Sequence, residues 1–256
     1  MLGDIIIRYA SLPSANDEAK ARAQSLPEGS VITALAQTRG RGRLGRVWES
    51  DEKAGLYFSV ILKPRGQLDN APSLALAAGI AVRRAIEEVT SLRPILKWPN
   101  DLLINDKKIC GILLEARTAG GSGPAEQGAD EFICGIGVNV NNAGFSPEIA
   151  GKAASLFMEK GVQYSTDEML YAILRHFDAV YKLWLAEGFT ALKDEYAANC
   201  VHFRGSREVT IKRGGDALFS GFAEGVADDG GLIVVKDAGA YPQERVIVTS
   251  GEVSVK

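Results

Sequence analysis

The sequence has few cysteines and histidines, no long hydrophobic run and no excess of basic charge. Three cysteines occur in 256 residues, and Cys110 and Cys134 lie in apolar runs typical of buried thiols, which indicates a reducing, cytoplasmic location. No apolar run approaches the ~18 residues of a membrane span, and the N-terminus lacks signal-peptide features. The net charge of −3 argues against a general nucleic-acid coat. His176 and His202 lie outside every motif described below and receive no role.

Apolar residues make up 46% of the chain, which is enough for a sizeable core. The pattern of apolar and turn residues predicts an α+β domain over residues 1–204, and shorter β-rich runs separated by Gly and Asp predict a small barrel over residues 205–256. A loop is expected at 118–130. One strand is expected to start at 5–7. The other expected strands are 31–36, 56–62, 102–104, 109–115, 132–140, 208–212, 218–223, 232–236 and 245–249. Helices are expected between Ser14 and Pro27, over 72–89, and from the capping box at Ser165 to Gly188, where an apolar stripe indicates core packing.

The segment from Gln37 to Trp48 alternates four arginines with three glycines. Its GxGxxG pattern resembles a dinucleotide fingerprint, but that motif requires a helix directly after the glycines, and a strand is expected here instead. Arginine–glycine segments that bind nucleic acids are usually longer tracts in disordered tails. A third interpretation is a clamp for a phosphate or carboxylate, because arginine binds both bidentately and glycine allows close backbone approach.

Two further stretches carry polar residues among predicted strands. The run KWPNDL over 97–102, followed by KKICGIL over 107–113, is either an ordinary Pro-Asn-Asp turn or a nucleotide site built from an amide, a carboxylate and a lysine. The run GIGVNVNN over 135–142 has glycines inside a strand, which indicates close approach by a neighbouring element or a ligand. Asn139 within it is a buried amide that needs partners.

Together, GRGRLGRVW, KWPNDL with KICGILLE, and GIGVNVN resemble the signatures of the biotin–protein ligase family, in order and spacing over essentially the whole chain. The resemblance implies a mixed central sheet flanked by helices, as in biotin and lipoate ligases and class II synthetases, with an SH3-like C-terminal barrel. Some family members carry an N-terminal DNA-binding domain. This chain starts at the catalytic domain and therefore resembles the monofunctional form.

The resemblance also implies roles for individual residues. Arg41, Arg43, Lys108 and Asp101 would be catalytic, and magnesium would enter with ATP without a directly assigned protein ligand. Two positions depart from the usual pattern: Ala15 replaces a threonine, and Arg39 replaces a small residue. The residues expected around biotin or its adenylate are Ser14, Ala15, Asn16, Gln37, Gly40, Arg41, Gly42, Arg43, Lys108, Gly111 and Gly135. Those expected around ATP are Arg46, Trp48, Asn100, Asp101 and Asn139.

The implied reaction is ATP-dependent formation of biotinyl-5′-AMP, followed by transfer of biotin to a lysine of a carboxylase carrier domain, the activity of a biotin–[acetyl-CoA-carboxylase] ligase. No DNA and no membrane are expected as partners. A homodimer is possible through the 132–140 strand, if that strand forms a sheet edge. The alternatives are a lipoate–protein ligase on the same scaffold and a nucleic-acid-binding module that uses the arginine loop.

Overall fold

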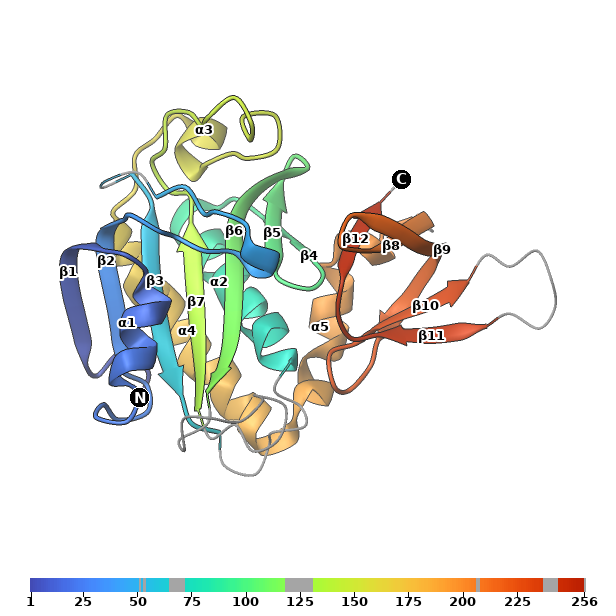
Figure 1. Cartoon of the computed structure of the whole chain (residues 1–256), viewed down its shortest axis with the longest axis horizontal. Coiled ribbons are helices and arrows are strands. Elements are labelled where there is room, and N and C mark those ends of the chain that lie inside the picture. Colours follow the sequence, from blue (N-terminus) through green and yellow to red (C-terminus); the bar gives the residue numbers. More distant parts are fainter. Residues whose placement is uncertain are drawn as a thin grey trace.

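The computed structural model describes residues 1–50, 52, 54–64, 72–117, 131–205, 208–236 and 244–255. Its larger part is built on a seven-stranded sheet with the order β1-β2-β3-β7-β6-β5-β4, in which β1 and β2 are parallel and all other neighbours antiparallel (Figure 1). The strands are β1 (Ile6–Leu12), β2 (Val31–Gln37), β3 (Leu56–Leu62), β4 (Ile95–Lys97), β5 (Asp101–Ile104), β6 (Lys107–Arg117) and β7 (Glu131–Val138).

Helices cover both faces of this sheet (Figure 1). The long helices α2 (Ser73–Thr90) and α4 (Thr166–Glu187) pack against each other and against one face, whereas α1 (Ala15–Arg22) contacts the other face at β2, β3 and β7. Burial from both sides explains why β3 is apolar at every position except Ser59 and buried at all seven positions. The remaining helical elements are α3 (Leu156–Lys160), α5 (Lys193–Ala198) and single turns at Arg43–Gly45, Phe189–Leu192 and Val201–Phe203.

The Ser165 N-cap and the apolar stripe predicted for α4 are present, the cap as the serine half of the expected capping box. The Ser165 hydroxyl accepts a hydrogen bond from the Glu168 N–H at 3.2 Å, and the stripe is buried in the main core. The Trp184 indole N–H donates to the Ser73 hydroxyl at 2.8 Å, which joins α4 to the start of α2. Because an indole N–H is costly to bury without a partner, this bond fixes how the two helices meet.

The C-terminal part is a five-stranded antiparallel sheet with the order β11-β10-β9-β8-β12. Within the described residues the outer strands β11 and β12 do not pair, so the expected barrel is an open sheet. The Trp98 indole N–H donates to the Gly230 carbonyl at 2.8 Å and ties this sheet to the larger part. Its strands are β8 (Glu208–Arg213), β9 (Asp216–Val226), β10 (Leu232–Lys236), β11 (Arg245–Val248) and β12 (Glu252–Val255), of which β12 was not expected from sequence.

Two sequence-based expectations are wrong. The 132–140 strand is not a sheet edge, because β7 lies between β3 and β6. The expected strands leave residues 105–108 as the connection between β5 and β6, but only Asn105 and Asp106 form the turn. Both have positive φ, as in the tight turns that suit hairpin twist. The loop expected at 118–130 lies outside the described residues.

Candidate active site

Two adjoining cavities lie on the α1 face of the sheet, where the Arg/Gly segment crosses it. The larger has a volume of about 510 Å³ and the smaller about 50 Å³. Their walls share Gly42, Arg43, Trp48, Asn100 and Lys108, so one molecule in each cavity would meet at these residues. The smaller cavity also contains Ser14, Asn16, Gln37, Arg41, Gly111 and Gly135 from the predicted biotin set. The larger contains Arg46, Asp101 and Asn139 from the predicted ATP set.

The sheet floor is made of glycines that face the cavities. In β7, Cys134 and Ile136 point into the core beneath α2 and α4, so the alternate positions Gly135 and Gly137 face the α1 side. A Cβ at Gly135 would lie 2.0 Å from the Asn16 amide oxygen, and a Cβ at Gly137 would lie 2.7 Å from the Trp48 indole. The close approach expected at these glycines is therefore made by neighbouring side chains.

The Arg/Gly segment is a short hairpin rather than a loose loop. The Gly42 N–H donates to the Arg46 carbonyl at 2.8 Å, and the Trp48 N–H donates to the Gly40 carbonyl at 3.0 Å. At its tip, Leu44 has a φ of 56°, which is strained for a bulky residue, and its side chain is 65% exposed. The hairpin thus holds its arginines in place while its tip faces solvent.

The three arginines nearest the cavities have different partners. Arg41 pairs with Asp17 and lies 3.6 Å from Glu115. Arg46 pairs with Glu252 of the C-terminal sheet. Arg43 instead donates to neutral acceptors, the Asn100 side-chain oxygen at 3.3 Å and the Gly251 carbonyl at 3.5 Å. Burial lowers the pKa of Arg43, but a guanidinium stays protonated at neutral pH. Among the described residues, no carboxylate is bonded directly to this charge.

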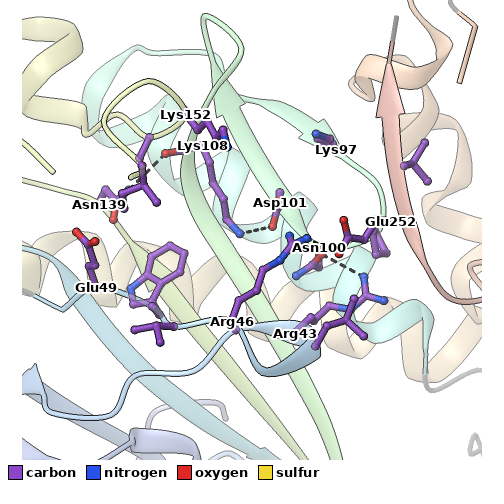
Figure 2. Close-up of a pocket in the computed structure, with 18 of the residues that line it drawn as sticks. Arg43, Arg46, Glu49, Lys97, Asn100, Asp101, Lys108, Asn139, Lys152 and Glu252 are labelled. Atoms are coloured by element: carbon purple, nitrogen blue, oxygen red, sulfur yellow. Dashed lines mark hydrogen bonds and ion pairs between the residues drawn. The ribbon is translucent and has the colours of Figure 1, made fainter. Parts of the chain in front are cut away.

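Lys108 and Asp101 form an ion pair at 2.6 Å at the junction of the cavities (Figure 2). The Lys108 ammonium also lies 5.3 Å from the centre of the Trp48 ring, within range of a cation–π interaction. The Trp48 indole N–H is buried and has no hydrogen-bond partner in the part of the chain that the structure describes. Such a group in a ligand-sized cleft indicates a position that a ligand or a rearrangement satisfies.

A polar network surrounds the smaller cavity. Asn16 accepts from the Ser59 hydroxyl at 2.5 Å and donates to Glu115 at 2.8 Å. Burial alone would raise the pKa of Glu115, but hydrogen bonds from Lys20 and Asn16 outweigh it and hold that pKa below its usual value. Ser59 was missed from sequence because a lone serine in an apolar strand carries no distinguishing signal.

Some expected residues lie beside the cavities rather than in their walls. The Ala15 N–H donates to the Gln37 side chain at 2.8 Å, which fixes the start of α1, and Gly40 packs against the Trp48 carbonyl. Ser14 does line the smaller cavity, and although it precedes α1 its side chain makes no cap hydrogen bond. The larger cavity adds wall residues that sequence reasoning missed: Glu49, Lys97, Phe145, Ile149, Lys152, Gly251, Glu252 and Val253.

The cysteines are unpaired and buried, and burial raises the pKa of the Cys134 thiol to about 12 and that of Cys110 still further. Neither thiol is therefore a nucleophile at neutral pH. Among the described residues, no group of three or more His, Cys, Asp or Glu side chains is arranged to hold a metal. Within the same residues, no helix has the length and apolar character needed to cross a bilayer.

Comparisons with known proteins agree with this geometry. Residues 7–139 match the model of the biotin/lipoate A/B protein ligase family, and residues 207–256 match the biotin protein ligase C-terminal domain. A biotin–[acetyl-CoA-carboxylase] ligase of Paracoccus denitrificans is 32% identical over 95% of this chain and 98% of its own length. The bifunctional ligase/repressor BirA of Bacillus subtilis is 34% identical over 93% of this chain and 72% of its own length.

Among solved structures, the biotin protein ligase of Aquifex aeolicus in complex with biotin and ATP has a TM-score of 0.82 and 29% identity, and 99% of each chain is covered. The family model spans more than half of this chain, and the C-terminal model accounts for the second sheet. The chain therefore belongs to the biotin/lipoate A/B protein ligase family, in the branch that carries the biotin protein ligase C-terminal domain.

Proposed function

We propose that the protein is an ATP-dependent biotin–protein ligase, which makes biotinyl-5′-AMP and transfers biotin to a lysine of a carboxylase carrier domain. The observation that carries the proposal is the junction of the two cavities at Arg43, Lys108 and Trp48. A small acid in the smaller cavity and a nucleotide in the larger would bring their reacting ends together there. The names of the relatives, biotin–[acetyl-CoA-carboxylase] ligases among them, support biotin as that acid.

In the first half-reaction a carboxylate oxygen of biotin attacks the α-phosphorus of ATP. A bond from the carboxylate oxygen to phosphorus forms, the bond to the bridging oxygen breaks, and pyrophosphate leaves with the electron pair. Both reactants are anionic, so fixed cations must offset their repulsion. Lys108 and Arg43 stand at the junction, and preorganised donors of this kind commonly contribute 10²–10³-fold in rate each.

Magnesium is part of the proposal, and the donors present fit it. Mg²⁺ is usually held by one or two carboxylates together with nucleotide phosphates. Asp101 and Asn139 provide oxygens in the larger cavity, beside the expected position of the phosphates. When bound, the ion would neutralise phosphate charge.

In the second half-reaction the amine of the acceptor lysine attacks the acyl carbon. An amide bond forms, the bond from the acyl carbon to the phosphate oxygen breaks, and AMP leaves with the electron pair. The attacking ammonium must first lose a proton. Asp101 is the carboxylate at the junction, and we assign it the orientation of the ammonium or the acceptance of its proton.

Ligand binding requires the hairpin to move. A cavity of about 50 Å³ is far below the ~300 Å³ at which ligand pockets typically begin. Trp48 occupies the space above Gly111 and Gly137, and its unpartnered N–H shows that it can change place without losing a hydrogen bond. Closing over the adenylate would then exclude water from an easily hydrolysed anhydride. We expect residues 38–47 to be protected from proteolysis only with biotin and ATP bound, and equal cleavage without ligand would contradict this.

Location and assembly are also proposals. The three unpaired cysteines support a reducing cytoplasm. If the chain forms a homodimer through its main sheet, β1 is the available edge. The edge of β4 is covered, because the Leu96 N–H donates to the Asn199 carbonyl at 2.8 Å and Leu96 bridges Cys200.

The test compares substrates and acceptors directly. The protein is incubated with ATP, Mg²⁺ and either biotin or lipoate, with a carrier domain as acceptor, and pyrophosphate release and carrier mass are followed. We expect pyrophosphate release and a carrier mass increase with biotin alone. Lipoate modification would support the lipoate alternative, which the family name covers but the relatives' names do not favour. Salt-sensitive DNA or RNA binding without ligation would support the nucleic-acid alternative.

A further inference from the structure

A buried hydrogen bond fixes the C-terminal sheet to the larger part of the molecule. The indole N–H of Trp98 donates to the carbonyl of Gly230 at 2.8 Å, and the Trp98 residue is only 2% exposed. Asp228, in the same β9–β10 turn, also bonds Thr190 and Lys193, but these contacts lie on the exposed surface. Because a buried indole N–H without an acceptor is costly, the Trp98 bond determines where this turn docks.

The acceptor side of this bond is rigid. Gly230 has a φ of 90°, in the region that favours glycine, and a Cβ there would lie 2.9 Å from the Ser73 Cα at the start of α2. Within the turn, the Gly230 N–H donates to the Ala227 carbonyl at 3.0 Å, and the Ala227 N–H donates to the Gly231 carbonyl at 2.8 Å. The turn therefore presents its carbonyl to Trp98 from one fixed position, packed against the backbone of α2.

The donor side of the bond belongs to the wall of the larger cavity. Trp98 lines that cavity and directly follows β4, two residues before Asn100 and three before Asp101. The Asn100 side-chain oxygen accepts from Arg43 at 3.3 Å. Asp101 pairs with Lys108 at 2.6 Å. A shift of the Trp98 ring would therefore move the short stretch of chain that holds both of these contacts.

The C-terminal sheet also supplies a wall of the larger cavity. Gly251, Glu252 and Val253 line it, and Glu252 pairs with Arg46 of the hairpin. Strand β12, which carries Glu252 and Val253, is joined to the docked turn through its pairing with β8 and the pairing of β8 with β9. Figure 1 shows this sheet beside the β4 edge of the main sheet. The place where the turn docks on Trp98 therefore also sets the position of residues 251–253.

We propose that Trp98 is a positioning residue for nucleotide binding. Its bond to Gly230 aligns the β12 wall of the larger cavity with the stretch that holds Asn100 and Asp101. This inference rests on the proposed function, because it takes ATP to be the occupant of the larger cavity. None of the described residues of the C-terminal sheet lines the smaller cavity, so the joint acts on ATP and not on biotin.

The experiment compares two tryptophans in the full-length protein. Trp98→Phe keeps an aromatic ring and removes the N–H bond to the C-terminal sheet. Trp184→Phe is the matched control, because it removes an indole bond of the same 2.8 Å length, to the Ser73 hydroxyl, within the larger part. Both variants should unfold at a lower urea concentration than the wild type.

Only Trp98→Phe should change the ATP constants. We expect its KM for ATP to rise about 3- to 10-fold, in the range of a lost neutral hydrogen bond. Its KM for biotin should stay within about twofold, and both constants should stay within about twofold in Trp184→Phe. A merely structural role of Trp98 would instead give the two variants the same kinetic profile.

The acceptor side provides a second pair of variants, which also carries the test if Trp98→Phe does not fold. Gly230→Ala strains the turn and pushes it from Ser73, so it should raise the KM for ATP by a similar factor. Gly225→Ala in β9 is its control, because no atom lies within 4 Å of the added Cβ. Since both changes act on one joint, Trp98→Phe with Gly230→Ala should raise the KM for ATP little more than either alone.

Hydrogen exchange gives a readout that needs no turnover. The amides of residues 251–253 should exchange faster in Trp98→Phe than in Trp184→Phe. Equal exchange in both variants would overturn the proposal, as would equal rises of the two KM values in Trp98→Phe or the same ATP effect in Trp184→Phe. If the wild type forms no adenylate, the proposed function fails instead, and the exchange comparison still tests the joint.

Discussion

The two cavities of this protein differ in how their charges are arranged. Around the smaller one, cations and carboxylates already satisfy each other: Arg41 pairs with Asp17, and Glu115 bonds Lys20 and Asn16. Around the larger one, Lys97 has no ion-pair partner among the described residues, and Arg43, which both cavities share, bonds only neutral acceptors. The walls of the larger cavity come from both sheets. The smaller cavity is therefore suited to a mostly neutral ligand that must displace internal contacts. The larger one is prepared for an anion before that anion arrives.

The largest expected effect comes from Lys108, which belongs to both cavities. Lys108→Ala should lower the rate of adenylate formation about 10²–10³-fold, because it removes a fixed cation at the reacting atoms and leaves Asp101 without its partner. Adenylate formation is measured by pyrophosphate release at saturating biotin and ATP. Lys107→Ala, on the opposite face of β6, is the control. A rate of adenylate formation that falls less than tenfold would mean that the reacting atoms do not lie at Lys108.

A drop in pH should lower the free energy of unfolding through a buried histidine beside the larger cavity. Burial lowers the pKa of His202, which lies next to Trp98, to about 4. The unfolded value is ~6.5, so the unfolded chain binds the proton more tightly between these pH values. Stability is therefore full above about pH 6.5 and falls by about 3 kcal/mol as the pH drops to about 4. Urea unfolding should show this loss in the wild type and a flatter profile in His202→Phe. Identical profiles would exclude His202 as its source.

Glu252→Gln tests whether the C-terminal sheet acts on the larger cavity alone. The exposed Arg46–Glu252 pair should contribute up to about 1 kcal/mol. Unlike Asp17, Glu252 belongs to a cavity wall, so loss of the pair should loosen the contact between the hairpin and the C-terminal sheet. The KM for ATP should therefore rise by up to about fivefold, and the KM for biotin should stay unchanged. Initial-rate kinetics with each substrate varied in turn would separate the two constants. Equal changes in both would mean that the hairpin couples the cavities tightly.

The smallest expected effect has the opposite sign. Asp17→Asn removes the carboxylate that holds Arg41 in the ligand-free protein, so biotin would compete with one partner fewer. We expect the KM for biotin to fall by up to about fivefold and the KM for ATP to stay constant. Arg41→Ala, in contrast, should weaken biotin binding. A higher KM for biotin in Asp17→Asn would show that Asp17 helps to bind the ligand.

Much of the fold and site could be predicted from local sequence. The α4 stripe and most strands follow from periodicity, and three glycine- and charge-rich motifs meet around the two cavities. Three features required the structure. The interior place of β7 depends on pairings of β3 with a strand far along the chain. Ser59 carries no local pattern that separates it from an ordinary strand residue, and Lys97, although it opens the KWPNDL run, has no feature that assigns it a role beside Asn100 and Asp101. The roles assigned to individual site residues remain predictions.

The contacts of the hairpin with Gly251 and Glu252 have a practical consequence. Only three residues separate Glu252 from Lys256, so any segment fused after residue 256 would start within one short stretch of chain from the larger cavity. A C-terminal affinity tag or a proteolytic trim at this end would then change apparent ATP binding although every motif residue is intact. The KM for ATP measured on such versions of the protein would include the effect of the tag or trim. A tag before Met1 would lie far along the chain from these contacts.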